Sequence, residues 1–387
     1  MNTTARFLLT IGLIASYMTP ATPAFAQDSR AAAIAAEQAE KAKRLRPYER
    51  SRAEQLITRA VESFSEPPSG FYPTFGSVYS GGGFALGPAY RRFYGDRSTV
   101  DARGLISIRN YKLAELGTNS PGHADGHVDL YARGSWLDAT RVSFYGVGPD
   151  SLKDSRTTFR LRETSVVGGI RARAVRWIVF GGAVAYEDFI QSPRDSPIAA
   201  PGPDTTYIHS TASAGIDWRP SAGYARRGGL YEIRYHNYTD RSDTFSFDRV
   251  DAEVVQHIPI LRENWVLSLR GEVRTTLDDG VVPYYMLPSL GSGSTLRAYG
   301  SWRFRDRHSE LFSAEWRWIP SRLALDMAIF YDAGKVASRR SDLDFDGLKS
   351  DVGIGARFHG PAATPFRIEW ARGREGMRLV FAGGPAF

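Results

Sequence analysis

The stretch WVLSLRGEVRTT, from Trp265 to Thr276, carries the pattern from which the fold can be predicted. Its apolar and polar side chains alternate, and in an extended chain alternate side chains point to opposite faces. The apolar face carries Trp265, Leu267, Leu269 and Val273, and the polar face carries Ser268, Arg270, Glu272 and Arg274. A strand between lipid and a polar lumen has this pattern, and so does a surface strand of a soluble β-sandwich. The stretch therefore predicts a β-strand, and the rest of the chain has to decide between the two classes.

The same alternation recurs from Gly70 to Phe387, in stretches of about ten residues that are separated by turn signals. Tight hairpin turns are indicated by Asp125-Gly126, Asp279-Gly280 and Asp346-Gly347. Tryptophans fall near the predicted strand ends, where membrane barrels carry interfacial aromatic girdles. These residues are Trp218, Trp265, Trp316, Trp318 and Trp370. The pattern favours a membrane barrel over a soluble sandwich.

We predict an all-β fold, a transmembrane antiparallel β-barrel of about sixteen strands over residues 70–387. The strands are predicted to begin near residues 70, 82, 98, 124, 139, 157, 175, 207, 228, 245, 264, 299, 322, 350, 365 and 376. An even number of strands puts both ends on one side of the membrane, and we expect the periplasmic side because the exported N-terminal segment enters from there. The longest connection, Thr276 to Tyr299, is then an extracellular loop.

The N-terminus has the features of a secretory signal peptide. Arg6 precedes an apolar run from Phe7 to Tyr17, and Ala24-Phe25-Ala26 forms a small-residue cleavage site. We predict a signal peptide over residues 1–26, cleaved before Gln27, and export to the bacterial outer membrane. Residues 27–69 are rich in Ala, Glu, Lys and Arg and contain Pro67-Pro68 near their end, which predicts a short helical periplasmic segment.

The composition excludes several kinds of site. The chain has no cysteine, so it can form neither a disulfide nor a zinc-thiolate site. Its formal net charge of +7 is spread along the sequence without a recognition motif, which argues against nucleic-acid binding and fits rims that contact outer-membrane lipids. His123 and His127 flank an Asp-Gly turn, and no nucleophile-elbow motif is present. We predict no catalytic, cofactor-binding or metal-binding residues, and thus no enzyme.

One long connection carries a family resemblance. It reads LPSLGSGSTLRAYGSWRFRDR, from Leu287 to Arg307, and is followed by SAEWRW, by AIFYDAGKV and by a phenylalanine, Phe387, as the last residue. These motifs resemble the BamA/TamA (bacterial surface antigen) superfamily of outer-membrane insertases and translocons. The stretches Phe144 to Ser151 and Asp217 to Gly229 support the resemblance. It implies a sixteen-stranded barrel and a long loop that folds back into the lumen.

The resemblance also implies a loop clamp, in which a loop arginine pairs with acidic residues of the lumenal wall. By motif position the clamp consists of Arg297, Ala298 and Tyr299 in the loop, with Glu315 and Asp332 as the acidic partners. Strand parity independently puts both carboxylates on the polar face, opposite aromatic and aliphatic residues. An ordinary lumenal charge network of the porin type would give the same parity. Ala298 stands where the family has glycine, and would be strained if the position required a positive φ.

The two ends of the chain differ in how closely they follow the family. Residues 27–69 are too short and too helical for the periplasmic substrate-handling module of family insertases, so the chain resembles barrel-only members. Gly376 to Phe387 alternates like a last strand and ends on Phe387, which we predict to be the signal read by the barrel-assembly machinery. Gly383, Gly384 and Pro385 weaken strand pairing there. The resemblance implies a weakly bonded seam between the first and last strands that could open laterally.

Three functions follow from this sequence. We expect first a loop-plugged barrel that assists insertion or translocation of membrane protein or lipid, with a protein substrate as a possible partner. A passive pore is the second alternative. The third is an anchoring barrel whose helical segment, residues 27–66, docks a periplasmic partner.

Overall fold

A computed structural model of the chain describes residues 32–41, 55 and 69–387, apart from 96, 196, 197, 199–201, 262, 278, 319–323 and 361. The predicted signal peptide lies outside the described residues. Residues 32–41 form a helix, in which Glu37 and Lys41 make an i,i+4 ion pair of 2.8 Å. This helix belongs to a unit separate from the barrel. No helix among the described residues is long and apolar enough to cross a membrane.

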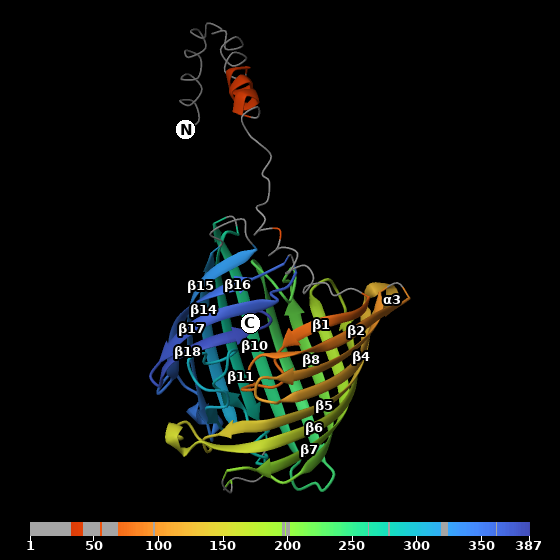
Figure 1. Ribbon diagram of the computed structural model, residues 1–387, viewed down its shortest axis with the longest axis vertical. Coiled ribbons are helices and arrows are strands. Elements are labelled where there is room, and N and C mark those ends of the chain that lie inside the picture. The colour runs from red at the N-terminus through yellow and green to blue at the C-terminus, as the bar shows by residue number, and fades with distance from the viewer. Residues whose placement is uncertain are drawn as a thin grey trace, which may run out of the picture. The chain divides into compact units, whose positions relative to one another are not determined.

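The barrel is one sixteen-stranded antiparallel sheet in which each strand pairs with its neighbour in sequence (Figure 1). The first eight strands are β1 (Gly70–Gly76), β2 (Ala85–Tyr94), β3 (Ser98–Ser107), β4 (Lys112–Gly122), β5 (Val128–Phe144), β6 (Thr157–Arg173), β7 (Ile178–Pro193) and β8 (Thr205–Asp217). The other eight are β9 (Gly228–Asp240), β10 (Phe247–Leu261), β11 (Trp265–Thr276), β14 (His308–Trp318), β15 (Leu325–Ala337), β16 (Lys349–Phe358), β17 (Phe366–Gly373) and β18 (Gly376–Ala382). Small elements in the connections are α3 (His123–Gly126), η1 (Lys153–Ser155), η2 (Arg340–Asp342), β12 (Ser289–Leu290) and β13 (Phe304–Arg305).

The predicted number of strands is confirmed, but two errors cancel within it. The prediction missed β4 and divided β5 into strands beginning near residues 124 and 139. The ladder between β5 and β6 shifts register between Ala139 and Val142, and such a bulge interrupts the alternation of faces. The strand predicted near residue 299 was also wrong, because β14 begins only at His308 and the connection before it covers residues 277–307.

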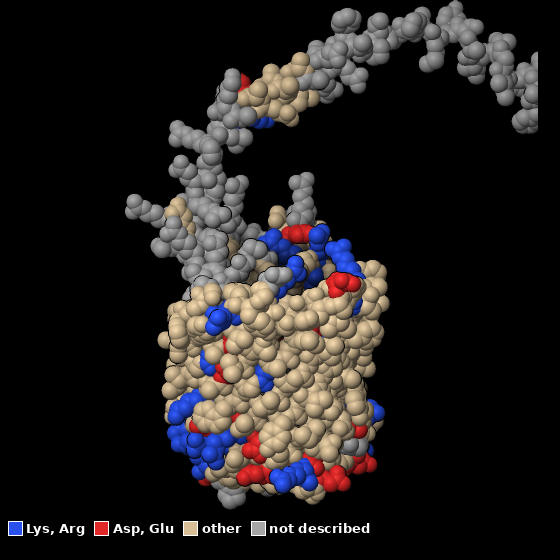
Figure 2. Space-filling model, turned by 90° about the vertical axis from the view of Figure 1, so that its right-hand side faces the viewer, with Lys and Arg blue, Asp and Glu red and all other residues tan. Residues whose placement is uncertain are grey.

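The outer face of the barrel is apolar and the inner face is polar. On β14, Trp316 is 45% exposed, whereas its neighbours Glu315 and Arg317 are buried. On β11, Trp265 and Leu269 are exposed and Ser268 and Glu272 are buried, as their parity predicts. Figure 2 shows one side of the barrel, where charged residues gather toward the two rims and the band between them is mostly other residues. An exposed apolar belt on every second strand position is the surface that a lipid bilayer covers.

The sheet has two edges, β1 and β18, and no ladder joins them among the described residues. Each of these strands has seven residues, whereas β5 and β6 have seventeen each. The barrel is therefore nearly closed, with a seam where main-chain hydrogen bonding between neighbouring strands is interrupted. We call this place the seam, and the 277–307 connection the long loop.

Candidate functional site

The long loop folds into the barrel and forms a small hairpin there. Its strands β12 and β13 pair through Ser289 with Arg305 and Leu290 with Phe304. The chain turns at Gly291, whose φ of 99° favours glycine, and a Cβ at this position would lie 2.3 Å from the carbonyl oxygen of Gly300. The turn therefore requires glycine, and it directs residues 292–299 toward the wall formed by β14 to β18.

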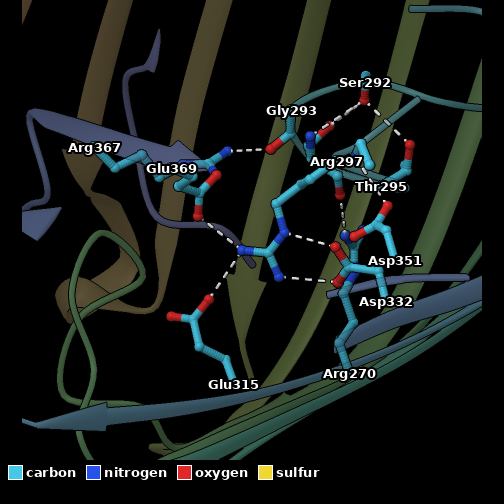
Figure 3. Close-up of polar contacts among 12 residues, drawn as sticks. Arg270, Ser292, Gly293, Thr295, Arg297, Glu315, Asp332, Asp351, Arg367 and Glu369 are labelled. Carbon is cyan, nitrogen blue, oxygen red and sulfur yellow. Dashed lines mark hydrogen bonds and ion pairs between the residues drawn. The ribbon is translucent and has the colours of Figure 1, made fainter. Parts of the chain in front are cut away.

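Arg297 lies at the centre of this segment and is 2% exposed. Its Nε and Nη2 donate to the two carboxylate oxygens of Asp332 at 2.7 and 2.9 Å (Figure 3). Its Nη1 donates to Glu369 at 2.7 Å and to Glu315 at 3.1 Å. The guanidinium carbon also lies 3.5 Å from the centre of the Phe330 ring. The loop is thus attached to β14, β15 and β17 through one side chain.

The charges around Arg297 form a closed network. Burial alone would lower the pKa of Arg297, but Asp332, Glu369 and Glu315 raise it well above its ordinary value. Arg357 bridges Glu315 and Glu369 at 2.5 and 2.6 Å, and Arg367 donates to Glu369. Removing one partner from a buried set of this kind costs about 3–5 kcal/mol, because a charge is left buried without its counter-charge. The network therefore holds the loop in one position.

The two residues after Arg297 are also fixed. The backbone N–H of Ala298 donates to Asp351 at 2.9 Å, and the Tyr299 hydroxyl donates to the carbonyl oxygen of Ser350 at 3.3 Å. The φ of Ala298 is not positive, unlike those of Gly291 and the later loop residue Trp302 (64°). Alanine at this position is therefore unstrained, and the departure from the family glycine does not disturb the loop.

The sequence prediction named Arg297, Glu315 and Asp332, and the structure brings these three side chains into contact. It missed Glu369 and Asp351, which approach the loop from β17 and β16. In the sequence Glu369 alternates with Ile368 and Trp370, which puts it on the polar face, but parity does not tell which polar residue of a distant strand reaches the loop. Only the closure of the sheet determines that contact.

The first part of the long loop makes a hydrophobic plug that the sequence did not predict. Tyr284 packs edge-on against Phe159 of β6, with ring centres 4.8 Å apart, and Tyr285 donates to the carbonyl oxygen of Pro203 at 2.7 Å. Together with the residues of the wall that it contacts, this plug forms a buried cluster of Tyr111, Ala139, Val142, Phe144, Phe159, Leu161, Phe189, Tyr207, Tyr238, Phe247, Val282, Tyr284, Tyr285 and Leu287. Burial beside this plug lowers the pKa of Arg305 to about 10.

The long loop contacts both sides of the seam from within. The indole N–H of Trp302 donates to the carbonyl oxygen of Ser80, in the connection after β1, at 2.9 Å. Arg303 donates to Glu375, in the turn before β18, at 2.8 Å. The Arg378 side chain of β18 donates to the carbonyl oxygen of Tyr299. The loop therefore links the β1–β2 connection to β18 and to the turn that precedes it, and no ladder among the described residues joins β1 to β18.

Phe387 lies beyond the end of β18. Its ring is parallel to that of His257 on β10, with centres 6.5 Å apart, and His257 is a buried residue of the inner face. The exposed aromatic residue of the last strand is Phe381, which alternates with Arg378 and Val380 as predicted. The structure thus places Phe387 against the inner wall of the barrel.

His123 and His127, on either side of the Asp125-Gly126 turn, have different hydrogen-bond partners. His123 bonds to the Ser120 hydroxyl at 2.9 Å, and His127 bonds to the carbonyl oxygen of Arg173 at 2.7 Å. They flank a turn in which Asp125 and Gly126 both have positive φ. Within the described residues no group of three or more His, Cys, Asp or Glu residues is arranged to hold a metal ion.

Comparisons with known proteins find the fold but no close relative. No protein-family sequence profile and no curated protein sequence matches the chain. BamA from Haemophilus ducreyi lacking POTRA domains 1–3 is 14% identical, with a TM-score of 0.59 over 81% of this chain and 70% of that one. CdiB from Escherichia coli is 11% identical (TM-score 0.58) and CdiB from Acinetobacter baumannii is 10% identical (TM-score 0.52). This chain covers 62% and 58% of these two structures, and they cover 82% and 80% of it. The chain therefore has the sixteen-stranded barrel fold of BamA and CdiB.

Proposed function

We propose that this protein is a loop-plugged barrel of the bacterial outer membrane that assists the insertion or translocation of protein or lipid without covalent chemistry. The proposal rests on the ion pairs that Arg297 makes with Asp332, Glu369 and Glu315. These carboxylates come from β14, β15 and β17, three of the last five strands of the sheet. A loop held there by charge can be released as a unit when the charges rearrange.

In this proposal the seam between β1 and β18 opens laterally. Its two strands are short and make no ladder with one another, so opening breaks few main-chain hydrogen bonds. The long loop links the connections next to them, through Trp302 to Ser80 and Arg303 to Glu375. Displacement of the loop would therefore both clear the lumen and free the seam.

We also propose how the chain is exported and assembled. The signal peptide of residues 1–26 would be cleaved before Gln27, and the residues after it would remain on the periplasmic side. The barrel-assembly machinery would recognise the last strand and Phe387. A periplasmic partner or protein substrate would approach from the side on which the chain enters.

Single-channel conductance of the purified protein in a planar bilayer tests the proposal. The wild type should give small, flickering currents, because the clamp and the hydrophobic plug fill the lumen. Arg297→Ala should raise the mean conductance severalfold, whereas the control Arg234→Ala, which removes a lumenal arginine of β9 bound to Glu232, should not.

A large steady conductance of the wild type would instead identify a passive pore. Equal currents from the wild type and Arg297→Ala, with equal barrel stability, would refute the clamp. Heated and unheated samples of each variant are compared on a cold denaturing gel. A folded barrel migrates more slowly after the sample has been heated, which checks that each variant has formed a barrel.

A further inference from the structure

A cavity of about 1080 Å³ lies at the seam. Its wall includes Phe75 and Gly76 at the end of β1 and residues 378–383 at the other edge. The long loop contributes Ser292, Gly293 and Ser294. We call this space the seam cavity. Among the described residues no ladder joins the two edges that border it, so a continuous ladder does not separate this cavity from the outer face of the barrel.

The seam cavity is lined by five arginines and by no aspartate or glutamate. They are Arg103, Arg109, Arg156, Arg367 and Arg378. A second lumenal cavity of about 910 Å³, the balanced cavity, is also lined by five arginines, but five carboxylates line it as well. The excess of positive charge is therefore particular to the seam cavity and not a general property of this lumen.

Three of these arginines carry the excess. Arg103 pairs with Glu115 and Arg367 with Glu369, whereas no ion pair joins Arg109, Arg156 or Arg378 to a carboxylate in the part of the chain that the structure describes. Arg109 donates to the carbonyl oxygen of Gly81 at 2.9 Å, and Arg156 donates to the Ser143 hydroxyl at 3.2 Å. A guanidinium has five N–H donors, so each keeps donors for a further acceptor.

The rim of the seam cavity is apolar on its outer side. Phe84 is 50% exposed and Ile108 is 78% exposed, and on β18 Leu379 and Phe381 are 56% and 58% exposed. Leu379 and Phe381 lie on the outer face of β18, and Phe84 and Ile108 lie in the connections next to β2 and β3. A molecule that fits this site has an anionic head for the arginines and apolar chains for the rim.

We propose that the seam cavity binds the headgroup of a phosphorylated lipid, with its acyl chains against Phe84, Ile108, Leu379 and Phe381. Phosphate is favoured because arginine binds it bidentately through charge-assisted hydrogen bonds, and because a bound phosphate neutralises charges that the protein leaves without partners. This inference goes beyond the proposed function, since it requires neither an open lumen nor a transported protein.

Binding of fluorescent phosphatidic acid to the whole protein in uncharged detergent micelles tests the inference, with diacylglycerol of the same chains as the reference lipid. The wild type should bind phosphatidic acid at least tenfold more tightly than diacylglycerol. Arg109→Gln/Arg156→Gln/Arg378→Gln should lose that preference. The matched control Arg133→Gln/Arg171→Gln/Arg234→Gln removes three arginines from the balanced cavity and should keep it.

Three results would overturn the inference: equal binding of the two lipids by the wild type, an equal loss in the control, or complete displacement of the lipid by millimolar inorganic phosphate. The last result would identify free phosphate as the ligand. If the triple variant does not form a heat-modifiable barrel, Arg109→Gln/Arg156→Gln changes only exposed residues of two connections and should still reduce the preference severalfold.

Discussion

Asp332 and Asp351 stand directly opposite one another on β15 and β16, and each binds one of two consecutive loop residues. Asp332 accepts both hydrogen bonds from one edge of the Arg297 guanidinium, and Asp351 accepts the backbone N–H of Ala298. Two carboxylates in such a cross-strand pair repel one another, and the loop supplies the donors that offset the repulsion. The loop and the wall therefore stabilise each other.

The two carboxylates should differ in what they contribute to stability. Asp332→Asn leaves Arg297 without its bidentate partner and should lower the free energy of unfolding by about 3–5 kcal/mol. Asp351→Asn keeps an oxygen acceptor for Ala298 and should cost about 1 kcal/mol. Urea unfolding of the barrel in lipid vesicles measures both. Equal losses would mean that the loop is held by general lumenal polarity.

Arg297→Lys should behave like a partial deletion. A lysine ammonium is a point charge and cannot donate in parallel to both oxygens of Asp332 while also reaching Glu369. We expect a bilayer conductance between those of the wild type and Arg297→Ala. The exchange Arg234→Lys on β9 is the control and should leave the conductance unchanged. If the conductance of Arg297→Lys equals that of the wild type, charge alone holds the loop.

A disulfide should lock the loop to the wall. A Cβ placed on Gly373 would lie 3.1 Å from the Cβ of Ala298, shorter than the roughly 3.5–4.5 Å of disulfides, so the bond requires a small outward shift of the loop. Because the chain has no cysteine, Ala298→Cys/Gly373→Cys would contain only this pair. We expect the oxidised protein to lose current flickering and a reducing agent to restore it. If flickering persists in the oxidised form, the segment whose motion causes it lies outside the clamp.

Ala298→Gly, which restores the family residue, should not stabilise this protein. The φ of Ala298 is not positive, so glycine relieves no strain and only adds freedom to the unfolded chain. A loss of about 0.4–1 kcal/mol in the free energy of unfolding is expected. A gain in stability would indicate that the loop tip is strained at this position.

Tyr284→Ala should weaken the hydrophobic plug. The side chain is 2% exposed and packs against Phe144 and Phe159, so its removal should cost about 3–5 kcal/mol by analogy with other buried aromatic residues. It should also raise conductance independently of Arg297, because the plug and the clamp occupy different parts of the lumen. If Tyr284→Ala has no effect on current in either background, the plug does not restrict ion flow.

Local pattern was enough to predict the faces of the strands but not the contacts made across the lumen. Glu315 and Asp332 followed from alternation together with the family resemblance. Tyr284 and Tyr285 did not, since their stretch has no periodicity and its partners lie up to about 140 residues earlier, at Phe144. The division of β5 has a local cause, because the bulge at Ala139 to Val142 resets the alternation in the middle of one strand.

All four carboxylates that bind Arg297 and Ala298 lie after them in the sequence, at positions 315, 332, 351 and 369. During folding the long loop therefore has no electrostatic partner until the strands synthesised after it have joined the sheet. Closing such long-range contacts is slow, because chain entropy is lost before any contact forms. A barrel truncated before β17 would lack Glu369 and leave Arg297 incompletely neutralised. Arg297 can therefore make its full set of ion pairs only after the C-terminal strands have joined the sheet.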